Sequence, residues 1–331
     1  MSAVDSDILL DVRDLEATFM TARGPVKAVD GVSFTVRRGE TLGLVGESGS
    51  GKTMTCLALL RLLPKASAAI TGGRVLFEGQ DLLRNSEAEM REIRGARISM
   101  ILQDSLTSLN PAFTVGAQVA EAIALHQRGR RRGLRRRVIH ALRRVRIPDP
   151  ESHVDDYPHV LSGGMRQRVA GAIALACNPA LLIADEPTTA LDVTVQAQYL
   201  RLLKDVQRES GMSMLFVTHD FGVVARMCDR VAVMYAGRIV ETAPTREIFA
   251  NPRHPYTRAL LECLPAVDGP AHELISIEGQ PPDVAHMPTG CRFAPRCAMA
   301  ADVCRSYPAE TTVTSEHRVS CWRPSAGVVV R

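Results

Sequence analysis

The chain has 331 residues, which is enough for one large domain or two smaller ones. Its hydrophobic fraction of 46% is ordinary for a globular protein, and no apolar run approaches the roughly 18 residues that cross a bilayer. A net charge of +4 is too small to indicate a nucleic-acid partner, and the acidic start lacks the basic and apolar stretches of a secretory signal. We therefore expect a cytoplasmic globular protein.

The first half of the chain alternates short apolar runs with turn signals. A helix is expected from residue 52 to about residue 63, where Pro64 stops it. Residues 115–147 have a helical and strongly charged pattern that contains the arginine run 128–137. The strands predicted in this half are residues 8–12, 32–36, 41–45, 75–78 and 97–102.

The second half continues this alternation to about residue 250. The apolar run 180–184 is typical of a strand buried on both faces of a parallel sheet. Ala236 and Gly237 separate two strand-like runs, as a hairpin turn does. Strands that alternate with helices predict an α/β sheet domain. The elements predicted here are helices 163–176 and 193–207 and strands 180–184, 214–217, 231–235 and 238–241.

The last part of the chain differs in composition. Prolines interrupt it repeatedly between residues 252 and 288. Of the eight cysteines, Cys56, Cys177, Cys228 and Cys263 are scattered among apolar neighbours and are expected to be buried thiols. The other four, clustered near the end, indicate a metal before a disulfide in a cytosolic protein. They are Cys291, Cys297, Cys304 and Cys321.

One segment fits the pattern G-x-x-x-x-G-K-[ST], in which backbone N–H groups wrap around a triphosphate. It lies between a predicted strand and a predicted helix, whose N-terminus favours negative charge. Lys52 would reach the β- and γ-phosphates of ATP, and Thr53 would bind Mg²⁺. A glycine-rich turn without a ligand is the alternative. The segment reads Gly46, Glu47, Ser48, Gly49, Ser50, Gly51, Lys52 and Thr53.

Two further motifs carry chemistry. At the end of the apolar strand, Asp185 would hold Mg²⁺ through water and Glu186 would orient and deprotonate the attacking water. Two adjacent acids could also simply begin a helix. The triplet Ser162, Gly163 and Gly164 suits anion binding at a helix N-terminus, and helix capping by the serine is its alternative explanation.

With the segments LSGGMRQR at 161–168 and IADEPTTALD at 183–192, the chain resembles the ATPase subunits of the bacterial dipeptide/oligopeptide ABC importers, nearly end to end. The resemblance implies a P-loop ABC-type nucleotide-binding domain over residues 1–255, with a RecA-like core and a helical subdomain at about 104–175. Residues 256–331 would form a small irregular extension with a cysteine cluster. The string GCRFAPRC at 290–297 is specific to the peptide/nickel permease group.

The resemblance also implies further site residues. Phe19 is similar to the aromatic residue that stacks on adenine, and Gln103 is similar to the Q-loop glutamine that senses Mg²⁺ and the membrane subunits. Asp192 matches the D-loop. His219 is similar to the switch histidine that contacts the γ-phosphate, and a surface imidazole after a strand is the alternative there. The predicted catalytic residues are Glu186, His219 and Gln103.

The family mechanism implies partners. ATP would lie between the phosphate loop of one ATPase subunit and Ser162, Gly163 and Gly164 of a second subunit, which is expected to be a different chain. Two membrane permease subunits and an extracytoplasmic peptide-binding protein would complete the importer, with this chain peripheral at the cytoplasmic face of the inner membrane. Nickel, opines or glutathione are the alternative cargoes.

Two other classes of function remain as alternatives. A soluble ABC ATPase working on ribosomes or DNA would need tandem cassettes or a long coiled coil, and neither pattern occurs in the sequence. A non-catalytic metal-binding adaptor would not need Lys52, Glu186 and His219. The arginine run 128–137 lacks interleaved aromatic residues for base stacking, so a solvated helical face is favoured, with contact to anionic lipid as a further possibility.

Four cysteines can hold Zn²⁺ or a [4Fe–4S] cluster. The spacings here lack the close C-x₂₋₄-C pairs that are common in zinc sites. The family resemblance points to iron–sulfur, so the cluster is favoured over zinc or reduced thiols. Its expected role is to hold the proline-rich extension together.

Overall fold

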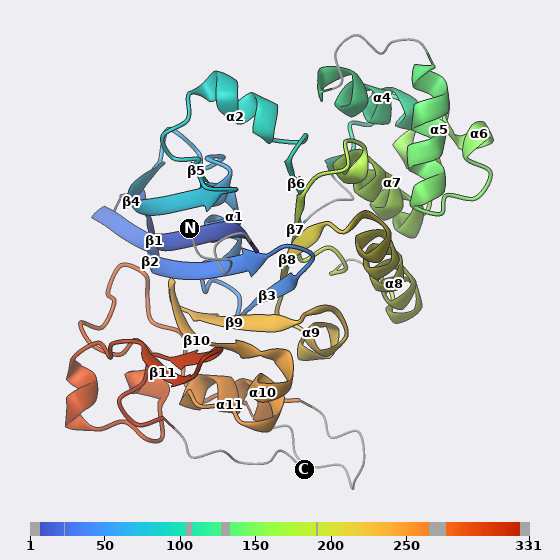
Figure 1. Ribbon diagram of the computed structural model, residues 1–331. Helices are drawn as coiled ribbons and strands as arrows, with labels where there is room; N and C mark the ends of the chain where they lie inside the picture. Colours follow the sequence, from blue (N-terminus) through green and yellow to red (C-terminus); the bar gives the residue numbers. More distant parts are fainter. Residues whose placement is uncertain are drawn as a thin grey trace, which may run out of the picture. The chain divides into compact units, whose positions relative to one another are not determined.

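The computed structural model describes residues 7–22, 24–103, 108–126, 133–189, 191–264 and 276–324 (Figure 1). The chain divides into two compact units. The first unit comprises Met1–Leu9, Val36–Thr41 and Arg84–Val217, and the second comprises Leu10–Thr35, Leu42–Leu83 and Thr218–Arg331. Within the described ranges, no helix combines the length and the apolar character needed to cross a membrane.

Three parallel strands form the centre of the first unit. Strand β7 (Leu181–Asp185) pairs with β6 (Ile98–Ile101) on one side and with β8 (Ser213–Thr218) on the other. Every residue of β7 and β8 is buried. An uninterrupted apolar run buried on both faces is the pattern of an inner parallel strand, so the strand prediction at 180–184 is confirmed with a shift of one residue.

Helices form most of the rest of the regular structure of the first unit. Among them α4, α5 and α7 contact one another in the same region of Figure 1. The predicted helical stretch 115–147 is divided, because α5 starts only after Gly133, which has a left-handed backbone with φ of 77°. Part of the arginine run lies outside the described residues. The helices are α2 (Glu87–Ile93), α4 (Val115–His126), α5 (Leu134–Arg144), α6 (Pro150–His153), the 3₁₀ helix η1 (Pro158–Val160), α7 (Gly163–Leu175) and α8 (Val193–Ser210).

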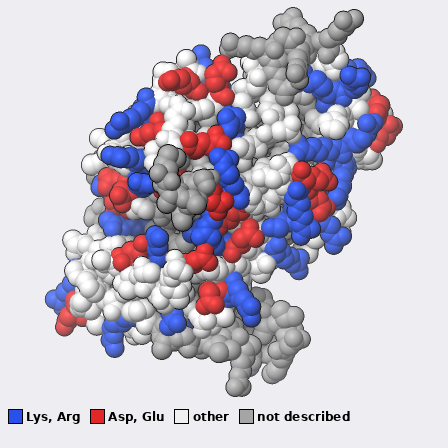
Figure 2. Space-filling model, viewed as in Figure 1, with Lys and Arg blue, Asp and Glu red and all other residues white. Residues whose placement is uncertain are grey.

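Three arginines of α5 and of the turn after it pair with acidic side chains. Arg135 contacts Asp155 at 3.1 Å, and Arg146 contacts Asp205 at 2.7 Å. Arg143 also pairs with Glu151. Figure 2 shows Lys and Arg side chains interspersed with Asp and Glu on the face in view. Exposed ion pairs of this kind stabilise little, and this pairing supports a solvated helical face over a dedicated anion-binding surface.

Two sheets build the second unit. One is antiparallel with strand order β2-β1-β4-β5, and the other contains the order β11-β12-β10-β9-β3, with β3 parallel to β9. The Ala236-Gly237 turn between β9 and β10 has positive φ at both residues, as a two-residue hairpin turn requires. The strands are β1 (Ile8–Thr21), β2 (Gly24–Arg37), β3 (Thr41–Val45), β4 (Ala68–Phe77), β5 (Gln80–Asp81), β9 (Arg230–Tyr235), β10 (Arg238–Pro244), β11 (Thr311–Thr314) and β12 (His317–Val319).

The C-terminal part is less irregular than the sequence predicts. Strand β12 pairs with β11 and also with β10, so it extends the sheet. All four residues of β11 are exposed, which explains why no apolar alternation marked this strand. The helices of the second unit are α1 (Lys52–Leu59), α9 (Phe221–Met227), α10 (Thr245–Ala250), α11 (Pro255–Glu262), η2 (Ala294–Arg296) and η3 (Asp302–Arg305). The predicted division at residue 255 stays a prediction.

A buried polar cluster fastens β12 to β10. The Glu241 carboxylate accepts hydrogen bonds from the backbone N–H groups of Arg253 and His254 at 2.7 and 2.9 Å. The same carboxylate lies 2.7 Å from Nε2 of His317. His254 is buried, and its Nδ1 accepts the Tyr256 N–H at 3.1 Å, which caps α11. Burial lowers the pKa of His254 from 6.5 to about 4, against the opposing pull of Glu241.

This depressed pKa predicts acid sensitivity of folding. Because the folded state resists protonation of His254, its contribution is complete above the unfolded pKa of 6.5 and is lost as the pH falls toward about 4. Between about pH 7 and pH 4.5 the loss should be roughly 2–3 kcal/mol of unfolding free energy. Urea unfolding at both pH values should show a smaller loss for His254→Asn, which keeps a capping acceptor but does not titrate. Equal losses in both proteins would contradict this assignment.

Candidate functional site

At two positions of the glycine-rich loop between β3 and α1, the backbone accommodates only glycine. Gly46 has φ of 154°, and a Cβ there would lie 2.1 Å from the Met234 carbonyl oxygen. Gly51 has φ of 103°, and a Cβ there would lie 2.5 Å from the Ala28 carbonyl oxygen. The loop therefore rests directly on neighbouring backbone. Ser48 and Gly49 are exposed at its tip.

Lys52 opens helix α1 and points back into this loop. Its side chain is largely buried, with the residue 5% exposed. The Nζ ammonium donates to the carbonyl oxygens of Gly46 at 2.7 Å and Glu47 at 2.9 Å, and to Oγ of Ser50 at 3.5 Å. Thr53 is half-buried at the next position. A buried ammonium at the start of a helix concentrates positive potential within the loop, which favours binding of a polyanion.

Two predicted catalytic residues, Gln103 and Glu186, contact each other in the first unit. The predicted Mg²⁺ ligand Asp185 directly precedes Glu186 in the chain. Asp185 is fully buried at the end of β7, where a carboxylate is costly without cationic or hydrogen-bond compensation. Glu186 follows with a left-handed backbone at φ of 45°, fixed by its N–H donating to the Val217 carbonyl oxygen at 2.9 Å. The amide Nε2 of Gln103 donates to Glu186 Oε2 at 3.3 Å. Asp104, next to Gln103, lies outside the described residues.

Thr189 is a site residue that the sequence analysis did not identify. Its hydroxyl donates to Glu186 Oε2 at 3.0 Å, to the same oxygen that Gln103 contacts. Two donors thus aim the Glu186 carboxylate, which is what a base that positions water needs. The signal available in the sequence was the hydroxyl three residues after the glutamate within a turn.

The signature and D-loop residues have local roles as helix caps. The Ser162 hydroxyl accepts the Met165 N–H at 3.3 Å at the start of α7, so capping by this serine is confirmed. Asp192 accepts the N–H groups of Thr194 and Val195 at 3.1 and 3.0 Å at the start of α8. Ser162 and Asp192 are nevertheless exposed, and Gly163 and Gly164 are half-buried. Capping and contact with a nucleotide on a neighbouring subunit are therefore compatible.

Phe19 and His219 belong to the second unit, together with the glycine-rich loop. Phe19 is half-buried on β1 opposite Ala68 of β4, and His219 is exposed directly after β8. The predicted site residues thus fall into two sets, one in each unit. The set in the first unit comprises Gln103, Asp185, Glu186 and the two capping motifs. That both sets converge on one nucleotide stays a prediction.

The four C-terminal cysteines line one pocket, beside Phe293 and Trp322. Burial raises the pKa of Cys291 and Cys297, and it raises that of Cys321 to about 11. Within the described ranges, no group of three or more histidine, cysteine or carboxylate side chains is arranged to hold a metal ion. The predicted iron–sulfur cluster is therefore not supported by the structure.

A glycine-rich loop closed over a buried lysine, with a carboxylate pair at the end of a buried parallel strand, defines a P-loop ATPase. The ABC transporter family model matches residues 29–189, and the model of the oligopeptide/dipeptide transporter C-terminal region matches residues 240–304. The "Probable peptide ABC transporter ATP-binding protein" of Sinorhizobium fredii is 52% identical over 96% of both chains. The dipeptide transport ATP-binding protein of Bacillus subtilis is 50% identical over 95% of this chain and 94% of its own.

The chain belongs to the dipeptide/oligopeptide family of ABC transporter ATP-binding proteins. Among solved structures, a dimeric bacterial ABC transporter cassette is similar with a TM-score of 0.64 and 29% identity. That similarity covers 72% of this chain and 99% of the cassette. As an ABC ATPase the chain hydrolyses ATP with Mg²⁺. This result confirms the predicted fold class and enzyme class.

Proposed function

We propose that the chain is the ATP-hydrolysing motor of a membrane importer for dipeptides or oligopeptides, attached at the cytoplasmic face of the membrane. The match of residues 240–304 to the oligopeptide/dipeptide transporter C-terminal region carries this proposal, because the description of that family model specifies the cargo, whereas the model that matches residues 29–189 specifies only an ABC transporter. The names of the two bacterial relatives support the same cargo. Nickel, opines and glutathione remain the alternative cargoes.

In the proposed mechanism, each predicted nucleotide-site residue has a role toward Mg–ATP. Lys52 holds the β- and γ-phosphates, and the loop N–H groups from Gly46 to Gly51 bind the phosphate oxygens. Glu186, aimed by Gln103 and Thr189, orients the attacking water and accepts its proton. His219 contacts the γ-phosphate. Thr53, Asp185 and Gln103 would hold Mg²⁺, which would supply positive charge beside the phosphates, and Phe19 would stack on adenine.

The proposed motor is a pair of cassettes. Ser162, Gly163 and Gly164 of one subunit close over the nucleotide held by the phosphate loop of the other, with Asp192 at the contact. A solved cassette in a post-hydrolysis state with ADP and phosphate is dimeric, which supports this arrangement. The second cassette is a different chain, and two permease subunits with an extracytoplasmic peptide-binding protein complete the importer. Nucleic acid has no part in it.

The function is tested on the intact membrane complex. We would purify this chain with its co-expressed permeases, second cassette and binding protein, and reconstitute them in proteoliposomes. Short peptides should stimulate ATP hydrolysis and accumulate inside, whereas nickel, an opine and glutathione should do neither. Transport of one of those three instead of peptides would reject the peptide assignment and leave the motor function intact.

We further propose that the four-cysteine pocket binds a [4Fe–4S] cluster, with Zn²⁺ as the alternative. Four thiols on one pocket support it, although the raised thiol pKa values mean that loading must release protons. Protein purified without oxygen should be brown and contain about four iron atoms per chain. Cys297→Ser should lose both, whereas Cys177→Ser, outside the pocket, should retain them. Colourless protein, with or without stoichiometric zinc, would reject the iron–sulfur proposal.

A further inference from the structure

Arg296, in the cysteine-rich string 290–297, contacts the phosphate loop directly. Its Nη1 and Nη2 donate to the Glu47 carboxylate at 2.7 and 3.1 Å. Its remaining N–H groups donate to the Tyr235 hydroxyl and to the carbonyl oxygens of Ile277 and Glu278 at 3.4, 3.2 and 3.0 Å. All five donors of the guanidinium are thereby used. Its side chain is only 4% exposed, so this is a built contact and not a surface ion pair.

Tyr256 holds the backbone of Glu47, the loop residue whose side chain Arg296 contacts. The Tyr256 hydroxyl accepts the Glu47 N–H at 2.9 Å. The tyrosine is fully buried, and its ring lies 4.5 Å from that of Tyr235 and 5.3 Å from that of Phe293, between centroids. A buried aromatic cluster of this kind fixes the position of the hydroxyl. Both the backbone and the side chain of Glu47 are thus held by residues near or within the C-terminal part of the chain.

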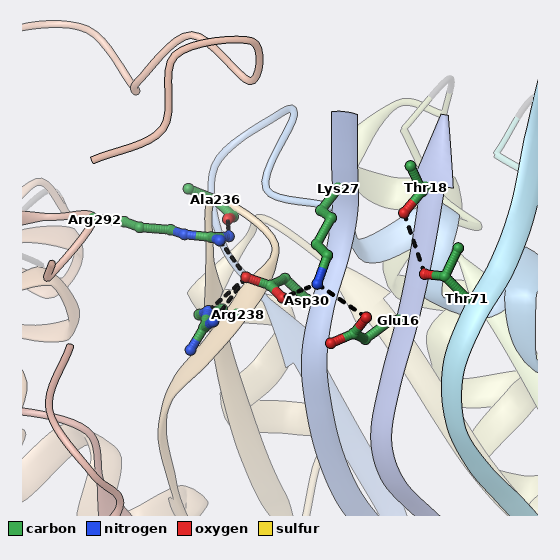
Figure 3. Close-up of polar contacts among 8 residues, drawn as sticks. All are labelled: Glu16, Thr18, Lys27, Asp30, Thr71, Ala236, Arg238 and Arg292. Atoms are coloured by element: carbon green, nitrogen blue, oxygen red, sulfur yellow. Dashed lines mark hydrogen bonds and ion pairs between the residues drawn. The ribbon is translucent and has the colours of Figure 1, made fainter. Parts of the chain in front are cut away.

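Arg292, four residues before Arg296, is connected to the loop through a chain of hydrogen bonds. Its guanidinium donates to the Ala236 carbonyl oxygen and to the Asp30 carboxylate (Figure 3). The Asp30 N–H donates to the Gly237 carbonyl oxygen at 2.9 Å, and the Gly237 N–H donates to the Ser50 carbonyl oxygen at 2.8 Å. The hairpin turn under the phosphate loop is therefore tied to the same cysteine-rich string.

The charge of Glu47 makes this brace relevant to the nucleotide. A carboxylate within a phosphate-binding loop repels a triphosphate unless it is neutralised and directed away. The bidentate pair with Arg296 does both, because it fixes the carboxylate toward the C-terminal part of the chain. A lysine could not reproduce the planar fork or the five bonds.

We propose that Arg296 and Tyr256 are positioning residues for ATP: they hold Glu47 so that the phosphate loop accepts a triphosphate, and the C-terminal part of the chain thereby sets nucleotide affinity. The inference rests on the proposed nucleotide site at Lys52. Neither residue is catalytic, because their polar groups are committed to the loop and its surroundings. A purely structural role for Arg296 would not depend on the charge of Glu47. Here, by contrast, loss of Arg296 weakens ATP binding because the Glu47 carboxylate is left without its guanidinium partner.

The test measures the Kd of Mg-ATP by calorimetry on the full chain. Arg296→Met should raise this Kd about tenfold, equivalent to about 1.4 kcal/mol of binding free energy. Adding Glu47→Gln to that variant should recover most of the affinity, since the unpaired carboxylate is then gone. Tyr256→Phe, which keeps the core packing, should raise the Kd by a few-fold, in line with the loss of one hydrogen bond.

The matched control is Arg305→Met, which removes an arginine of the same region whose side chain lies 3.1 Å from the Asp302 carboxylate and is 87% exposed. It should bind Mg-ATP as the wild type does. Unchanged affinity in both Arg296→Met and Tyr256→Phe would overturn the proposal, as would a double variant no better than Arg296→Met alone. If Arg296→Met does not fold, Tyr256→Phe decides in the same way. A wild-type chain that binds no ATP would refute the nucleotide site itself.

Discussion

Replacing Glu186 with glutamine is expected to lower ATP turnover by at least about a hundredfold while ATP binding is retained. The glutamine amide keeps the size of the carboxylate and can still contact water, but it cannot accept a proton. The left-handed backbone at Glu186 and its two side-chain donors, Gln103 and Thr189, hold this carboxylate in place. Turnover would be measured on the reconstituted complex, and trapping of the closed cassette pair by ATP would be followed by gel filtration.

Glu121→Gln provides the control for that experiment, because it removes an exposed glutamate of helix α4 in the same unit. It should leave both turnover and the association of the cassettes unchanged. Near-normal hydrolysis by Glu186→Gln would show that another group accepts the proton. The role of Gln103 and Thr189 would then be limited to the local structure of the turn after β7.

The sequence predicted those elements that local chemistry determines. Strand Thr41–Val45 has the expected bounds, because a short, mostly apolar run between turn residues has few alternatives. The hairpin turn at Ala236 and Gly237 was predicted from these two residues and the strand-like runs beside them. By contrast, α1 ends at Leu59, before the proline that was expected to stop it, and Arg61 has a left-handed backbone with φ of 52°. The end of that helix is thus set by a turn that no residue type signalled.

The functional site was predictable where motifs carry the chemistry, and less so where distant residues meet. Lys52, Glu186 and Gln103 were all proposed as site residues from motifs, and the structure places the last two in contact. The contact between Glu47 and Arg296 joins residues that are 249 positions apart, and no pattern in the chain indicates it. The cysteines were correctly grouped, because they share a pocket, but the metal inferred from that grouping is not supported.

Replacing Lys52 with methionine is expected to weaken Mg-ATP binding roughly a hundredfold, or about 2.7 kcal/mol. Methionine fills similar space, so the change mainly removes the ammonium. Two effects add in the same direction: the triphosphate loses its nearest buried cation, and the Gly46 and Glu47 carbonyl oxygens lose the donor that organises the loop. Calorimetry of Mg-ATP binding to the full chain measures the loss.

Lys65→Met is the matched control, since it removes an exposed lysine outside the loop and should leave the affinity unchanged. If the two variants bound Mg-ATP equally well, the buried ammonium of Lys52 would be a structural feature of the loop and the phosphates would be held elsewhere. If only Lys52→Met loses affinity while its melting temperature without nucleotide is preserved, the loss comes from missing contacts to the phosphates. The loop geometry then serves mainly to present this one charge, which is why its glycines must approach neighbouring backbone so closely.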